Sequence, residues 1–95
     1  MSALRIYYDK QVLPDGAIVE MVIWQLPKPE AKRAHSLKYR LFYGKNGVRI
    51  IGYDNERGKG DHRHYGANEE SYTFESVEKL IADFSSDVKE SRGET

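Results

Sequence analysis

The fold is decided by residues 35–54, which read HSLKYRLFYGKNGVRIIGYD. Residues 37–43 alternate apolar and polar side chains, the two-residue period of a strand with one buried face. The Asn46-Gly47 pair that follows is a strong signal for a hairpin turn, and residues 48–54 return as the next strand. We therefore predict an antiparallel hairpin, whose buried face carries Leu37, Tyr39, Leu41 and Tyr43.

Two further strands are predicted upstream of this hairpin. Residues 3–8 alternate in the same way, and residues 13–16, Leu-Pro-Asp-Gly, favour a turn. Residues 17–26, AIVEMVIWQL, are apolar on both faces, which places this strand centrally, with Trp24 in the core. One face is expected against a helix and the other against a partner, for example a second copy that forms a homodimer through the sheet face. An exposed Trp24 would mark an interface instead.

The chain after residue 66 predicts a loop, a short strand and a helix. Residues 67–71 are polar and loop-like, and residues 72–74 are the candidate edge strand. Ser76 is a suitable N-cap for a helix with one apolar face, formed by Val77, Leu80, Ile81, Phe84 and Val88. The predicted fold class is α+β: an antiparallel meander of four to five strands with a C-terminal amphipathic helix packed on one face.

Composition narrows the class of protein further. The 95 residues suit a single domain, 1–95, with a charged mobile connection at 28–34 and a frayed tail at 89–95. Basic and acidic residues balance at fifteen each, so net charge does not select a nucleic-acid partner. There is no cysteine and no apolar run of membrane-spanning length, which favours a cytoplasmic protein that does not enter a membrane.

Residues 53–66, YDNERGKGDHRHYG, hold the groups with the most chemical potential. If the backbone is extended, His62 and His64 point the same way with Cα atoms ~6.7 Å apart, so two imidazoles can flank one phosphate. Metal-free RNA cleavage needs such a pair, one group taking the 2′-hydroxyl proton and another protonating the leaving oxygen. Phosphate charge would be met by nearby cations and by glycine N–H groups, namely Arg63, Lys59, Arg40, Gly58 and Gly60.

Two other interpretations of the same residues stay open. His62 and His64 with Asp54 or Asp61 supply nitrogen and oxygen ligands for a divalent ion such as Zn²⁺. Alternatively the stretch is a polar loop whose histidines pair with carboxylates at the surface. A basic face for single-stranded RNA is a related hypothesis, formed by Lys38, Arg40 and Arg49 with Tyr39, Tyr43 and Tyr53 as stacking groups, against the alternative of a solvated sheet face. His35 is interpreted as a surface histidine.

Residues 53–64, YDNERGKGDHRH, closely resemble the signature of the TumE family of toxins from toxin–antitoxin pairs. The resemblance extends to HSLKYRLFYG at 35–44 and to SYTFESVEKLIADFSSDV at 71–88, so it covers about residues 17–88. One departure is Gly52, where many members are expected to carry Arg. The signature positions are Asp54, Asn55, Lys59, Asp61, His62, Arg63 and His64.

The resemblance implies a cytoplasmic toxin that is neutralised by a helix-turn-helix antitoxin. Combined with the chemistry above, it predicts an endoribonuclease that needs no cofactor, with a divalent metal as the alternative. The expected catalytic residues are His62, His64, Asp61, Asp54 and Tyr53, and the expected substrate-binding residues are Lys59, Arg63, Arg40, Gly58, Gly60 and Asn55. The competing hypothesis is an interaction module without catalysis, which docks on the antitoxin and on a cellular target.

Overall fold

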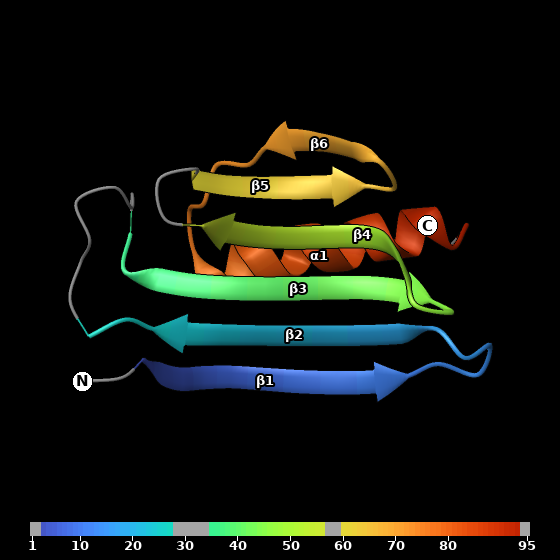
Figure 1. The fold of residues 1–95 in the computed structure, drawn as a ribbon, viewed down its shortest axis with the longest axis horizontal. Coiled ribbons are helices and arrows are strands. Elements are labelled where there is room, and N and C mark those ends of the chain that lie inside the picture. The colour runs from blue at the N-terminus through green and yellow to red at the C-terminus, as the bar shows by residue number, and fades with distance from the viewer. Residues whose placement is uncertain (1–2, 28–34, 57–59, 94–95) are drawn as a thin grey trace.

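The computed structural model describes residues 3–27, 35–56 and 60–93, which form six strands and one helix. These are β1 (Leu4–Val12), β2 (Ile18–Gln25), β3 (Leu37–Lys45), β4 (Val48–Glu56), β5 (Gly60–Tyr65), β6 (Asn68–Ser71) and α1 (Val77–Ser91). The strands lie in chain order in one antiparallel sheet, with β1 and β6 at its edges (Figure 1). The predicted α+β meander is confirmed, although the sheet has six strands rather than four or five.

The central hairpin is confirmed at the predicted turn. Asn46 and Gly47 take φ values of 54° and 77°, the left-handed conformation that a tight hairpin of this type requires, and Lys45 pairs with Val48. Tyr39, Leu41 and Tyr43 are all at most 5% exposed, as the alternation predicts.

Helix α1 divides the sheet into two unlike faces. The Oγ atom of Ser76 accepts the N–H of Lys79 at 3.1 Å and caps the helix, as predicted. Leu80, Phe84 and Val88 then pack against one face, here called the helix side, to which the odd-numbered residues of β2, β5, β3 up to Tyr43 and β4 from Ile51 point. A register shift after Tyr43 pairs Arg49 with Gly44, so Arg49 lies on the opposite face. Six strands span about 24 Å, whereas one helix is about 10 Å wide. The opposite face, here called the open face, is covered by no element of the described chain (Figure 1).

Three details differ from the prediction. The last strand is β6 at 68–71, not 72–74, because Gly66, with φ of 57°, reverses the chain directly after β5. Helix α1 continues to Ser91, so the frayed tail does not begin at residue 89. Trp24 is half-buried on the open face rather than in the core, because its neighbour Ile23 points to the helix side. Lys38 Nζ lies over the Trp24 ring, 5.9 Å from the ring centroid.

The connection at 28–34 lies outside the described residues. No helix in the described part of the chain is both long enough and apolar enough to cross a lipid bilayer.

Candidate functional site

The two histidines of the signature share one face of an extended strand. His62 and His64 lie in β5, opposite Asp54 and Gly52 of β4. Because side chains two apart in a strand point the same way, both imidazoles and Asp54 lie on the open face. On the far side of β4, Arg40 of β3 pairs with Asp54, so a row of polar side chains crosses three strands.

Glu69 of β6 joins the two imidazoles. Its carboxylate lies 3.7 Å from His62 Nδ1 through Oε1 and 3.4 Å from His64 Nδ1 through Oε2. The other ring nitrogen of His64, Nε2, lies 3.3 Å from Asp54 Oδ1. The side chain of His64 is only 11% exposed, whereas that of Glu69 is 56% exposed. On the open face, the Nδ1 atoms of both histidines therefore face one exposed carboxylate, that of Glu69.

Sequence reasoning missed Glu69 because residues 67–71 were assigned to a loop. The signal that finds it is Gly66: a tight turn after Tyr65 makes Asn68 its partner, and the antiparallel register then places Glu69 opposite His64.

A hollow of about 320 Å³ adjoins this pair on the open face. Its floor is Gly52, the direct neighbour of His64, and its walls include Arg40, Arg49 and Asp54. A Cβ atom on Gly52 would lie 2.6 Å from Arg49 Cδ, so the arginine side chain lies directly across this glycine. The position where the resemblance expects an arginine thus lacks one in sequence, but the side chain of Arg49 occupies the space above it.

Three further signature residues that the structure describes, Asn55, Asp61 and Arg63, point to the helix side, away from the histidines. Asp61 accepts the hydroxyl of Tyr39 at 2.6 Å and the Nε2–H of His35 at 2.8 Å. The N–H of Leu37 donates to His35 Nδ1 at 3.2 Å, so the proton of the neutral ring is on Nε2 and both nitrogens are engaged. The ring of His35 also packs on Phe74, with centroids 4.1 Å apart. His35 is therefore a partly buried structural contact, with its side chain 16% exposed, rather than the surface histidine that was predicted.

Asn55 ties two strands together at the end of their ladder. Its Oδ1 accepts the N–H of Tyr39 at 3.0 Å, and its Nδ2 donates to the carbonyl of Leu37 at 2.8 Å. The residue is 4% exposed, and backbone pairing of β3 with β4 starts only at Arg40. The amide thus replaces backbone hydrogen bonds, which is a structural role rather than the substrate-binding role that was predicted.

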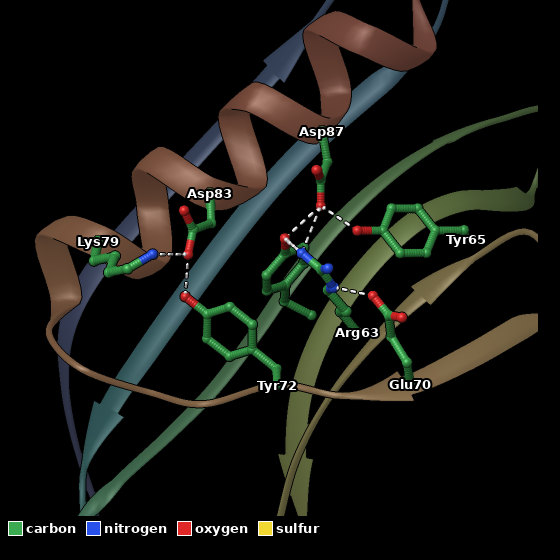
Figure 2. A network of polar contacts seen from close by, with 8 residues as sticks. Arg63, Tyr65, Glu70, Tyr72, Lys79, Asp83 and Asp87 are labelled. Atoms are coloured by element: carbon green, nitrogen blue, oxygen red, sulfur yellow. Dashed lines mark hydrogen bonds and ion pairs between the residues drawn. The ribbon is translucent and has the colours of Figure 1, made fainter.

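Arg63 belongs to a network that fastens α1 to the sheet (Figure 2). Tyr53 of β4 is part of the same network. Arg63 donates to Glu70 and, at 3.3 Å, to the hydroxyl of Tyr53, which itself donates to Asp87 of α1. Tyr65 donates to the same Asp87 oxygen at 3.1 Å. Burial and then the bond to Asp87 raise the pKa of Tyr53 well above its usual value, so the hydroxyl keeps its proton. Burial alone would lower the pKa of Arg63, but its bonds to Tyr53 and Glu70 raise it.

The structure thus separates the predicted site residues into two groups. His62, His64, Asp54 and Arg40 come together on the open face, while Asp61, Tyr53, Asn55 and Arg63 lie on the helix side. The physical reason is alternation: neighbours in an extended strand point to opposite faces. Gly60 begins β5 with a φ of 79°, a conformation that favours glycine. Gly58 and Lys59 lie outside the described residues.

The alternative metal site is not formed among the described side chains. No group of three or more histidine, cysteine or acidic residues in that part of the chain is arranged to hold an ion. Tyr39, Tyr43 and Tyr53 are buried on the helix side, so they are not stacking groups for an RNA bound on the basic open face.

Comparison with known proteins adds the family. A family model described as "Toxin TumE" matches residues 2–92, nearly the whole chain. The match makes this protein a toxin of a toxin–antitoxin system, whose partner is an antitoxin. The chain belongs to the TumE family, as the signature at 53–64 indicated. Neither the curated proteins nor the solved structures gave a match.

Proposed function

We propose that this toxin cleaves RNA in the cytoplasm, without a metal, through His62 and His64 on the open face. The observation that supports the proposal is their placement: both imidazoles share one exposed face beside a hollow lined by Arg40 and Arg49. Rings two residues apart leave room for a phosphate between them. The regulator proposed for this activity is a helix-turn-helix antitoxin.

The proposed reaction is a transesterification. The 2′-oxygen attacks phosphorus, the bond from phosphorus to the 5′-oxygen breaks, and a 2′,3′-cyclic phosphate forms. One imidazole accepts the 2′-hydroxyl proton and the other gives a proton to the departing 5′-oxygen. Glu69 orients both rings in the absence of RNA, and Asp54 holds His64 from its other side. Arg40 and Arg49 stabilise the additional negative charge on the phosphorane.

The test is cleavage of a labelled RNA by purified protein, with and without a chelator. Replacing both histidines (His62→Ala with His64→Ala) should lower the cleavage rate about a hundredfold or more, because acid and base catalysis are both lost. The matched control is His35→Gln. It changes the remaining histidine, which lies on the helix side, and should retain the cleavage rate within a fewfold. Equal cleavage by the double variant would overturn the proposal, and loss of cleavage with chelator would indicate metal chemistry instead.

A second candidate function, binding without catalysis, is favoured by strand β1. This edge strand is nine residues long and exposes Leu4 by 67%, Ile6 by 47% and Val12 by 68%. Long edges with apolar side chains are usually protected by charge, by a bulge or by a partner. Strand β1 has an irregularity between Arg5 and Tyr7 and charged residues at 9 and 10, which protect it only in part. We expect the antitoxin to add a strand to this edge. A homodimer through the open face, where Trp24 is partly exposed, stays a prediction.

Charges on the β1 edge provide the test of this docking mode. Ile6→Lys combined with Val12→Lys should weaken antitoxin binding about tenfold or more, measured by calorimetry. The reason is that a strand added to this edge would remove two lysine charges from water, which costs free energy. Val48→Lys is the control, since Val48 is equally exposed, at 65%, but begins β4. Undiminished binding by the β1 variant would exclude this edge.

A further inference from the structure

Two glycines on the open face allow neighbouring side chains to lie flat on the sheet. A Cβ atom on Gly44 would lie 2.6 Å from Phe42 Cζ, and one on Gly52 would lie 2.6 Å from Arg49 Cδ. Real Cβ atoms do not approach other atoms this closely, so any larger residue would displace the phenyl ring or the arginine. Both glycines are buried beneath these side chains. The sequence therefore builds a platform of one aromatic ring and one guanidinium at the β3–β4 hairpin.

Arg40 adds a second cation beside this platform, and Asp54 forms one side of the hollow above it. The Cζ atom of Arg40 lies 5.2 Å from the centroid of the Phe42 ring, within the range of a cation–π contact. Arg40, Phe42, Arg49 and Asp54 together line the hollow of about 320 Å³ above Gly52. Arg40 is only loosely held elsewhere, since its Nη1 is 3.8 Å from Glu20 and its side chain is 56% exposed.

This combination of groups suits one ligand class in particular. An aromatic ring stacks on a nucleobase whatever its identity, and guanidinium groups bind phosphate through paired N–H donors. A duplex would keep its bases stacked on one another, so the ring is accessible only to an unpaired base. Asp54 adds an acceptor for a hydroxyl or amino group, and it also contacts His64 at 3.3 Å.

We infer that this hollow is a subsite for one nucleotide of single-stranded RNA, with the base taking the place of the Arg40 guanidinium on the Phe42 ring and a phosphate held by Arg40 and Arg49. The inference rests on the proposed function, because RNA is taken as the ligand. Gly52 and His64 are direct partners in the sheet, about 5 Å apart across the strands. A nucleotide in the subsite therefore places an adjoining phosphodiester beside the imidazoles. This differs from the predicted basic face, because Phe42 and not the tyrosines provides the stacking surface.

The test uses a short single-stranded RNA in which every 2′-hydroxyl is methylated, so that binding is measured without cleavage. By fluorescence anisotropy, Phe42→Leu and Arg49→Ala should each weaken binding about tenfold, since each removes one of the two contacts. Gly52→Ala should do the same by displacing Arg49, and circular dichroism shows whether it folds. The matched control is Arg5→Ala, which removes another exposed open-face cation, on β1, and should change binding less than twofold.

The results separate the subsite from the catalytic proposal. The subsite is measured by binding of an RNA that cannot be cleaved, and the catalytic proposal is measured by cleavage of unmodified RNA, so either can fail without the other. Weaker binding by Phe42→Leu and Arg49→Ala would support the subsite even if the wild type proves not to cleave RNA. Wild-type affinity in both variants, an equal loss in Arg5→Ala, or no RNA binding by the wild type would each overturn the inference.

Discussion

Replacing Asp87 with alanine is expected to lower the free energy of unfolding by about 3 kcal/mol. The carboxylate is 14% exposed and accepts hydrogen bonds from Tyr53 and Tyr65, with Arg63 Nη1 3.8 Å away. Its removal leaves two hydroxyls without their common acceptor and a guanidinium without a nearby carboxylate, at the point where α1 meets β4 and β5. Figure 2 shows Asp87 beside Arg63 and Tyr65. The measurement is the urea midpoint of unfolding, followed by circular dichroism.

Asp83→Ala is the matched control for this prediction. Asp83 lies one turn earlier on the same helix and accepts from Tyr72 at 2.6 Å and from Lys79 at 2.8 Å. Its side chain is 28% exposed, so water can replace the lost partner, and about 1 kcal/mol is expected. If both variants lose the same free energy of unfolding, Asp87 contributes no more to stability than Asp83 does.

Alkaline pH is expected to unfold the protein steeply. Burial, followed by hydrogen bonds to Asp61 and Asp87, raises the pKa of Tyr39 and Tyr53 above the ordinary value of 10.0. In the unfolded chain both hydroxyls ionise near pH 10, whereas in the folded chain both keep their protons. Their contribution to stability is therefore complete below pH 10 and decreases as the pH rises above it. About one unit above pH 10, the two tyrosines together cost about 3 kcal/mol of stability.

The check is a pH titration that records tyrosinate absorbance and circular dichroism together. Both signals should change in one steep transition, because the buried hydroxyls ionise only when the sheet opens. Tyr53→Phe removes one of four tyrosines whose pKa is raised by burial, the others being Tyr39, Tyr65 and Tyr72, and should lower the pH dependence of stability by about a quarter. Ionisation of all seven tyrosines with unchanged circular dichroism would contradict the expectation.

The local elements of this fold are predictable because their signals are local. The Asn46-Gly47 turn fixes the central hairpin, and Ser76 with the apolar spacing after it fixes the start and the buried face of α1. The sixth strand is not, because the Asn68–Ser71 sequence NEES is polar on both faces and is a strand only through its pairing with β5.

The candidate site is predictable only in part, for a related reason. The spacing of His62 and His64 correctly indicates one shared face once the backbone is known to be extended. Arg63 was grouped with them as a phosphate-binding cation, although the same extended backbone turns Arg63 to the helix side. Glu69 contacts the two histidines only because of the strand register, and Asp87 contacts Tyr53 only because of how the helix packs. The local sequence does not encode either arrangement.

The alternation in β5 has a consequence for how this toxin loses activity. Selection for cells that survive the toxin should recover two classes of inactive protein from one six-residue segment. Changes at positions 61, 63 and 65 would reduce the amount of folded protein, whereas on the proposed mechanism a change at the more exposed His62 would leave folded but inactive protein. The second class would still bind the antitoxin. A single base change could therefore produce an inactive toxin that competes with the active toxin for the same antitoxin.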